Sequence, residues 1–193
     1  MNRKLIIIAG YLAAGKTTLS LKLSNELGIP VFCKDLLKIA LSRSLPVNNR
    51  SESKRLSAAT FDAIAFITER FMETGQALII EANFVMAENH NQLREGDVLK
   101  ELIKRYDYQA LTFVLHGDVG ILCKRFNERE KLPERGDANR AEAPYDCDLF
   151  AETVIPLGDF DIGGEIIKID TTDFSAVDLD LYVETARRFV NSC

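Results

Sequence analysis

Short apolar runs alternate with longer amphipathic stretches along most of the chain. The apolar runs cover residues 5–9, 31–33, 77–80, 110–115 and 165–169, and most of them are rich in branched side chains. Runs of this length, bounded by turn residues, are typical of buried strands. Repeated alternation of strand and helix predicts an α/β protein with a parallel sheet covered on both faces.

The stretches between these strands carry apolar residues at helical spacing. The first predicted helix begins near Lys16 and ends before Gly28. A longer one is capped by Ser51 or Ser53 and stops at Gly75. Its apolar stripe is expected to consist of Leu56, Ala59, Ala63, Ile67 and Phe71.

Three further helices are predicted, over residues 93–106, 118–126 and 179–190. Residues 127–144 break this rhythm, because they contain proline, glycine and many charges but almost nothing apolar. A segment that cannot bury a face is expected to be exposed and mobile. We therefore predict one domain, residues 1–193, with a small mobile lid at about 127–144.

Composition and charge narrow the possible partners. A length of 193 residues suits one domain, and the net charge of −5 opposes general binding to nucleic acid. No apolar stretch approaches the roughly 20 residues that span a membrane, so we expect a soluble, cytoplasmic protein. The cysteines have neither CxxC spacing nor paired histidines nearby, which predicts free thiols at Cys33, Cys123, Cys147 and Cys193.

Residues 10–17, Gly-Tyr-Leu-Ala-Ala-Gly-Lys-Thr, match G-x-x-x-x-G-K-[ST] between a predicted strand and a predicted helix. The glycines let successive backbone N–H groups point at a phosphate, and the helix N-terminus adds its positive end. Lys16 would contact the β- and γ-phosphates, and the Thr17 hydroxyl would bind Mg²⁺. Contacts to Mg-ATP are therefore predicted for Gly10, Ala13, Ala14, Gly15, Lys16, Thr17 and Thr18.

With this motif the chain resembles the adenylate-kinase-like group of P-loop kinases, particularly its small-molecule, gluconate kinase-like, chloramphenicol phosphotransferase-like and polynucleotide kinase-like branches. The resemblance covers nearly the whole chain. It implies a three-layer P-loop NTPase fold whose five-stranded parallel sheet has the order 2-3-1-4-5. The first three strands would then bring the P-loop, Asp35 and Glu81 together at their carboxyl ends, where ligands bind in open α/β sheets.

The resemblance implies roles for polar residues after the second and third strands. In similar kinases an acid at the place of Asp35 contacts the acceptor hydroxyl and serves as general base; otherwise Asp35 is a helix N-cap. Glu81 resembles a Walker-B acid that holds Mg²⁺ directly or through water; otherwise it is a strand-end acid in water. Asn83 either binds the acceptor or orders its loop. Lys34 or Lys38 could be the basic residue that binds the acceptor, or both could be solvated.

The resemblance also assigns arginines around the lid. The family's R-x-x-x-R matches Arg125 and Arg129, which share one face of a helix. Arg125 would stack on adenine and Arg129 would reach the phosphates. Arg135 and Arg140 would join them from the lid or remain solvated, although the Arg-His-Pro-Gly of related kinases is replaced here by Arg-Gly-Asp-Ala.

The loop after the last strand, Asp170-Thr171-Thr172, would by the same resemblance pass its backbone at Thr171 against adenine; alternatively it forms a turn. His90 and His116 have no spacing typical of a metal site, and we assign neither to catalysis.

These features predict a kinase that moves the γ-phosphate of Mg-ATP to a hydroxyl of a small molecule. Lys16, Asp35 and Arg129 would be catalytic, and Thr17 and Glu81 would hold the metal. The alternatives are a nucleotide or polynucleotide 5′-kinase and an ATPase switch controlled by a partner. Long nucleic acid and membrane are not expected partners, and nothing in the sequence indicates an oligomeric state.

Overall fold

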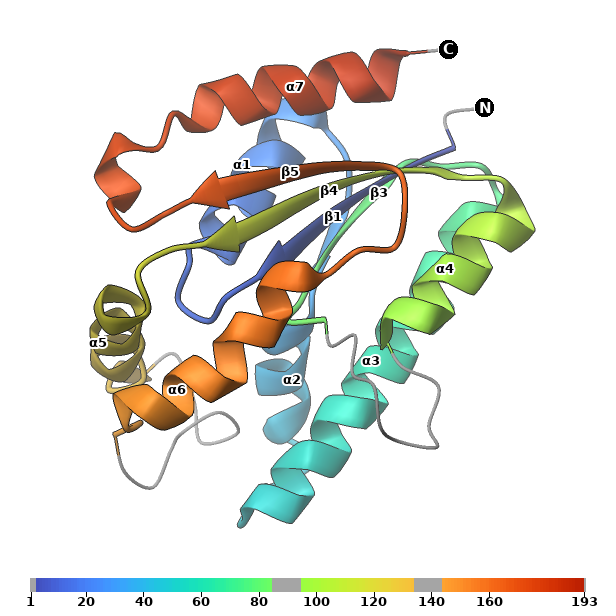
Figure 1. Cartoon of the computed structure of the whole chain (residues 1–193). Coiled ribbons are helices and arrows are strands. Elements are labelled where there is room, and N and C mark those ends of the chain that lie inside the picture. The colour runs from blue at the N-terminus through green and yellow to red at the C-terminus, as the bar shows by residue number, and fades with distance from the viewer. Residues whose placement is uncertain (1–2, 85–94, 134–143, 193) are drawn as a thin grey trace.

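The computed structural model describes residues 3–84, 95–133 and 144–192 (Figure 1). Its strands form one parallel sheet in the order β2-β3-β1-β4-β5. The predicted order is confirmed. The strands are β1 (Lys4–Gly10), β2 (Val31–Cys33), β3 (Leu78–Glu81), β4 (Gln109–His116) and β5 (Glu165–Asp170).

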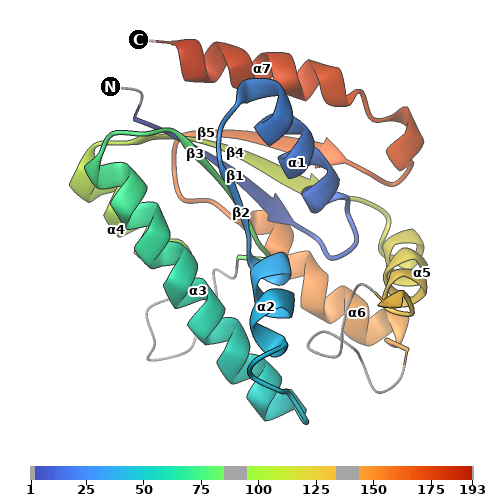
Figure 2. The same ribbon diagram turned by 180° about the vertical axis from the view of Figure 1, so that it is seen from behind.

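Helices cover both faces of this sheet. Figures 1 and 2 show α1 and α7 on one face, α3 and α4 on the other, and α5 and α6 beyond the carboxyl ends of the strands. The helices are α1 (Lys16–Leu27), α2 (Lys34–Ser42), α3 (Arg50–Glu73), α4 (Glu95–Tyr106), α5 (Val119–Arg129), α6 (Cys147–Val154) and α7 (Leu179–Asn191), with short 3-10 turns η3 (Ile155–Asp159) and η4 (Phe174–Ala176).

The central strand β1 holds the two layers together because its side chains alternate between the faces. Ile6 and Ile8 belong to the core that contains Leu19 of α1, whereas Ile7 belongs to the core that contains Ile64 of α3. All of these side chains are 0% or 1% exposed. Each contributes about 1.5–3 kcal/mol by leaving water. The P-loop thus follows a strand that is anchored on both sides.

The long helix α3 differs from its prediction in its cap and in its buried stripe. Its N-cap is Asn49, whose side chain accepts the backbone N–H of Glu52, and neither predicted serine caps it. The stripe that faces inward is shifted by one position from the predicted one after the first residue, because Ile64, with Phe61 beside it, packs into the core in place of the smaller Ala63. It consists of Leu56, Thr60, Ile64, Thr68 and Met72.

The segment proposed as a lid is only partly described. Helix α5 continues to Arg129, so the first three residues of 127–144 are helical. Residues 134–143 lie outside the described part of the chain, and the lid and the domain limits remain predictions. Helix α6, which was not predicted, begins after Asp146, whose carboxylate accepts the N–H groups of Asp148 and Leu149.

The prediction of free thiols is wrong for Cys123 and Cys147, which form a disulfide between α5 and α6. Their Cα atoms are 5.7 Å apart, within the range that a disulfide bridges. The Asn127 side chain brings the two helices together, because it bonds both the N–H and the C=O of Tyr145. Cys33 is a buried free thiol, and Cys193 lies outside the described residues.

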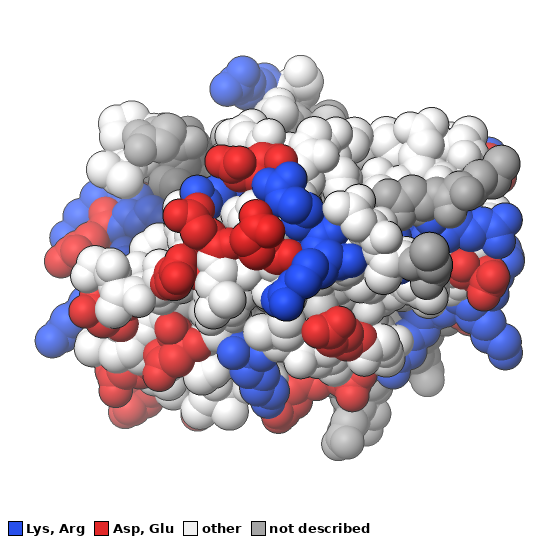
Figure 3. Space-filling view, turned by 90° about the horizontal axis from the view of Figure 1, so that it is seen from above, with Lys and Arg blue, Asp and Glu red and all other residues white. Residues whose placement is uncertain are grey.

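The surface carries charges of both signs. Figure 3, which looks onto the face over α7, shows acidic side chains gathered beside a short run of basic ones. Within the described ranges, the helices are all too short or too polar to cross a bilayer.

Candidate functional site

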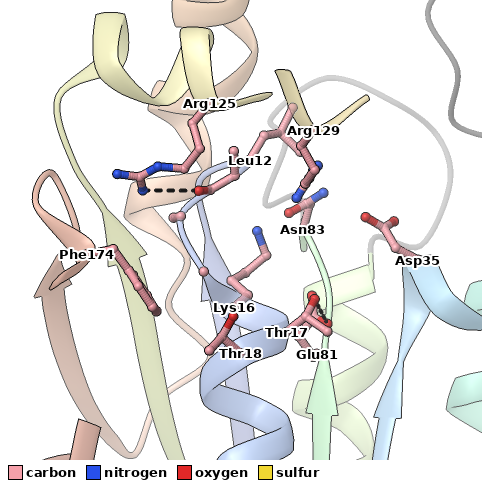
Figure 4. Close-up of a pocket in the computed structure, with 13 residues that line it drawn as sticks. Leu12, Lys16, Thr17, Thr18, Asp35, Glu81, Asn83, Arg125, Arg129 and Phe174 are labelled. Carbon is pink, nitrogen blue, oxygen red and sulfur yellow. Dashed lines mark hydrogen bonds between the residues drawn. The ribbon is translucent and has the colours of Figure 1, made fainter. Parts of the chain in front are cut away.

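A cavity of about 330 Å³ lies at the carboxyl ends of the strands (Figure 4). This volume falls in the range of roughly 300–1,000 Å³ that is usual for small-molecule sites. The cavity joins most of the predicted site residues from α1, α2, β3 and α5. Its lining consists of Leu12, Ala13, Ala14, Gly15, Lys16, Thr17, Thr18, Asp35, Glu81, Asn83, Arg125, Arg129 and Phe174.

The P-loop owes its shape to residues with positive φ. Gly10 has φ 112°, and a side chain there would meet the Leu115 carbonyl oxygen at 2.1 Å. That carbonyl also accepts the N–H of Tyr11 at 2.8 Å, which fixes the start of the loop to β4. Ala13, with φ 59°, is in a conformation that L-residues rarely adopt. Strain of this kind is typical of loops that bind ligands.

Lys16 lies at the floor of the cavity and is 7% exposed. Its ammonium donates to the carbonyl oxygens of Gly10 at 3.2 Å and Tyr11 at 2.5 Å. These bonds hold the ammonium within the loop. A phosphate bound by the loop amides would replace the two carbonyl oxygens as the partner of the ammonium. Ala14 and the N-cap Gly15 lead into α1, which begins at Lys16, and the unpaired N–H groups of its first turn favour an anion.

Thr17 and Glu81 form the candidate metal site. The Thr17 hydroxyl donates to Glu81 Oε2 at 3.0 Å, and Glu81 is 3% exposed. Burial raises the pKa of the Glu81 carboxyl, nearby Lys16 opposes that rise, and Asp35 adds to it. Mg²⁺ prefers a hydroxyl and one or two carboxylates beside phosphate oxygens, so this donor set fits Mg²⁺. Glu81 is a buried residue of β3, not an acid in open water.

Asp35 and Asn83 line the end of the cavity opposite Phe174 (Figure 4). Asp35 lies in the first turn of α2 and is not the N-cap, which is Cys33. The alternative of a capping role is therefore wrong. Asn83 Oδ1 is buried and, within the described structure, accepts no hydrogen bond. A buried acceptor without a donor is unfavourable, and a ligand hydroxyl could supply the donor.

Arg125 ties the P-loop to the loop after β5. Its guanidinium donates to the carbonyl oxygens of Ala13 at 3.4 Å, Thr171 at 3.2 Å and Thr172 at 3.1 Å. Thr171 is fully buried, its N–H and hydroxyl both bond the His116 carbonyl oxygen, and its side chain does not line the cavity. Asp170 accepts the N–H of Thr172, as the turn alternative requires, and the contact of the Thr171 backbone with adenine stays a prediction.

Phe174 is a cavity residue for which the sequence carried no motif. Its ring lies against Gly15, where an added Cβ would meet the Phe174 ring at 2.2 Å. On the other side, Arg129 points into the cavity toward Asn83 (Figure 4). Its guanidinium pairs with Glu130 at 3.1 Å and lies 5.3 Å from the Phe126 ring centre.

The other sequence candidates are placed away from the cavity or are not described. Gly10 shapes the loop without lining the cavity. His116 ends β4, where its ring packs edge-on against Tyr11 at 6.4 Å. His90, Arg135 and Arg140 lie outside the described residues.

Several solved structures superpose on this chain over nearly its whole length. A candidate kinase from Chloroflexus aurantiacus J-10-fl superposes with a TM-score of 0.85 at 24% identity, over 98% of this chain and 99% of that one. A sugar kinase from Janibacter sp. HTCC2649 gives 0.57 at 15% identity, covering 99% and 95%. Shikimate kinase from Acinetobacter baumannii, in complex with shikimate, gives 0.55 at 14%, covering 97% and 92%.

No protein-family model matches the chain, and no curated protein sequence matches it. At these identities the structural likeness establishes the fold alone. The chain therefore has the fold of the P-loop kinases.

Proposed function

We propose that this protein is a kinase that transfers the γ-phosphoryl group of Mg-ATP to a hydroxyl of a small molecule. The main support for the proposal is the set of residues that the cavity brings together. It contains Lys16 and Thr17 of a complete P-loop at its floor and Asp35 at its far end (Figure 4). A site that only holds nucleotide has no need of a carboxylate at the acceptor end, whereas phosphoryl transfer to a hydroxyl needs a proton acceptor there.

Each residue has a separate task in the transfer. The P-loop amides and Lys16 hold the β- and γ-phosphates, and Arg129 adds positive charge from the opposite wall. Asp35 orients the acceptor hydroxyl and takes its proton as the new P–O bond forms and the bond to the β-phosphate oxygen breaks, which releases ADP. Thr17 and Glu81 would hold Mg²⁺. The bound ion would neutralise part of the negative charge of the phosphates.

The nucleobase end is expected to lie between Arg125 and Phe174. The three carbonyl contacts of Arg125 hold its guanidinium plane in place, and a fixed plane can stack on a base. Phe174 offers an aromatic face in the same cavity. The backbone of Thr171, whose carbonyl oxygen bonds Arg125, would contribute through that arginine and not through its side chain.

The test measures ADP release from Mg-ATP by the purified chain, with and without a panel of hydroxyl compounds that includes polyols, nucleosides and short oligonucleotides. We expect one small-molecule class to raise ADP release well above the rate without acceptor. Asp35→Asn is expected to lower the acceptor-dependent rate about 10²-fold or more and to leave ATP affinity unchanged, because a general base contributes at this scale.

Two results would contradict the proposal. Turnover that requires another protein and ignores every hydroxyl compound would favour the partner-controlled ATPase. Turnover that rises only with oligonucleotides would favour the polynucleotide 5′-kinase, which the net charge of −5 opposes. A cytoplasmic location is part of the same proposal.

A further inference from the structure

The loop after β5 uses its hydrogen-bonding groups within the protein. The Thr171 N–H and hydroxyl donate to the His116 carbonyl oxygen at 2.7 and 2.8 Å. The Thr172 N–H donates to Asp170 Oδ1 at 2.8 Å, and its hydroxyl oxygen accepts the N–H of the N-cap residue of α5 at 2.8 Å. The carbonyl oxygens of both threonines accept N–H groups of Arg125. Each polar group of these two residues therefore already has a partner.

The next residue of this loop is engaged in the same way. Asp173 Oδ1 accepts the N–H of Ser175 at 3.0 Å and the Ser175 hydroxyl at 2.6 Å, and the Asp173 carbonyl oxygen accepts the N–H of Ala176. Asp173 and the two threonines are not among the described residues that line the cavity. The loop reaches the cavity through Phe174, whose side chain is an aromatic ring without a hydrogen-bonding atom.

The other walls at this end of the cavity are also planar or apolar. Figure 4 shows Arg125 and Phe174 at the end away from Asp35, and the side chains of the neighbouring Leu12 and Ala13 have no polar atoms. Both terminal nitrogens of Arg125 donate to carbonyl oxygens, which fixes the plane of its guanidinium. The N–H groups of a guanidinium lie in that plane, so they do not point at a base stacked on it. Among the residues that the structure describes, this end thus offers a base planar faces and no partner for its edge.

Adenine and guanine differ in the polar groups on their edges and not in their faces. Adenine carries an amino group where guanine carries a carbonyl oxygen, and guanine has a further amino group. A protein distinguishes such ligands when one of its polar groups bonds the edge of one base and stays unpaired with the other. Stacking on an aromatic ring or a guanidinium plane tolerates either base, because every base has a π-face.

We infer that the protein holds the nucleobase by its faces, between Arg125 and Phe174, and therefore accepts GTP as well as ATP. The inference rests on the proposed function, because it places the triphosphate on the P-loop. The polar groups of Thr171 and Thr172 bond within the protein, so the edge of either purine stays in water. Thr171 can contact the base but has no unbonded N–H with which to recognise adenine.

Calorimetric titration with the β,γ-imido analogues of ATP and GTP, each with Mg²⁺, tests this inference without turnover. The two dissociation constants are expected to agree within about fivefold, because one edge hydrogen bond lost with the wrong base would separate them by about fivefold to 150-fold. Magnesium tripolyphosphate, which has no base, should bind at least about fivefold more weakly than either analogue. A larger difference between the two purine analogues, in either direction, would overturn the inference. Binding of tripolyphosphate as tight as that of the analogues would overturn it too.

Variants assign the base contact to the Phe174 ring. Phe174→Leu keeps an apolar side chain against Gly15 and removes the aromatic face. It should weaken the binding of both purine analogues by the same factor, about fivefold to 150-fold, and leave the affinity for tripolyphosphate unchanged. Phe174→Tyr, which restores the ring, should keep both affinities. The matched control is Phe66→Leu, at an exposed phenylalanine of α3, which should change none of the three. A Phe174→Leu variant that loses affinity for one purine analogue only, or for neither, would overturn the inference.

Separate measurements of binding and turnover distinguish this inference from the kinase proposal. Equal binding of the two purine analogues by a protein that phosphorylates no acceptor would support the shared base site and count against the kinase. A clear preference for the ATP analogue, together with acceptor-dependent ADP release, would overturn the inference and leave the kinase proposal standing. With an acceptor in hand, GTP is expected to replace ATP with a KM within about fivefold.

Discussion

Lys16 is a buried charge whose position suits the binding of a ligand better than it suits the packing of the fold. Its ammonium is 7% exposed and is satisfied by carbonyl oxygens of its own loop. These neutral partners compensate only part of the cost of burying a full charge. The residue is therefore placed for a ligand with negative charge and contributes little to packing.

Lys16→Ala is expected to lower ATP turnover by at least about 10²-fold, because the charge on the migrating phosphoryl group loses a direct counterion. The thermal midpoint should stay the same or rise, since a buried cation is removed. ADP release and circular dichroism melting measure the two effects. Lys22→Ala, on the same helix but paired with Asp180 at the surface, is the control and should keep full turnover. Near-normal turnover in Lys16→Ala would contradict the site assignment.

Glu81 predicts a dependence of stability on pH. Burial raises the pKa of its carboxyl in the folded protein above the ordinary value of 4.5 that the unfolded chain keeps. Between these two values the folded state binds more protons than the unfolded state, so stability falls as pH rises through the window. Without nucleotide, Glu81→Gln should therefore be more stable than wild type at neutral pH, and the difference should shrink as pH falls toward 4.5.

Urea unfolding of both proteins across this pH range measures the effect. The same variant should bind Mg-ATP about 10–100-fold more weakly, as expected for loss of a group that holds or orients a metal. A stability difference that does not change with pH would show that the Glu81 carboxyl does not titrate in this window.

At the scale of elements, α5 connects parts of the site that are far apart in the sequence. It carries Arg125 to the P-loop and to the loop after β5, and its end places Arg129 at the cavity. Its N-cap Asp118 accepts the N–H of Ile121, and the Asp118 N–H bonds the Thr172 hydroxyl. The helix and the β5 loop are thus positioned together.

Arg125→Ala should lower the free energy of unfolding by about 1–3 kcal/mol, because carbonyl groups lose a charged donor. The KM for ATP should rise about tenfold, since the base loses a planar contact and Ala13 is held less firmly. Lys124→Ala, the exposed neighbour on α5, is the control and should change neither quantity. A variant with normal stability and normal KM would show that the three carbonyl contacts are dispensable.

The Cys123–Cys147 disulfide predicts a response to reductant. The bridge joins residues separated by 24 positions, and closing a loop of this size stabilises a protein by about 3 kcal/mol in the chain-entropy account. Reductant should lower the free energy of unfolding of the wild type by about this amount. It should have no effect on Cys147→Ala, which already lacks the bridge. Titration of four free thiols in the denatured, unreduced wild type would contradict the bridge.

At the scale of the whole molecule, the strands could be predicted because each is a short apolar run ended by turn residues. β1 is the clearest case, since all seven of its residues are buried. The strand order did not follow from periodicity and came from the resemblance that the P-loop motif suggested. The cap of α3 was missed because Asn49 competed with two nearby serines that are equally good caps.

The residues that line the candidate site likewise include some that could be predicted from the sequence and some that could not. Lys16 and Thr17 could be predicted because the motif has a fixed spacing, and Asp35 because it follows a strand that ends beside the P-loop. Phe174 and the Cys123–Cys147 bridge could not, because both depend on contacts between distant segments that no local pattern records. Residues 134–143, where the remaining lid arginines lie, are not described.

The hydrogen bond from the Tyr11 N–H to the Leu115 carbonyl oxygen has a consequence for biosynthesis. The ribosome makes the phosphate-binding loop near the start of the chain, but β1 reaches its final place only when β3 and β4 stand on either side of it. We therefore expect that a nascent chain that ends before Leu115 does not bind nucleotide. On the proposed function, ATP would stabilise only a late stage of folding, after more than half of the polypeptide has been synthesised.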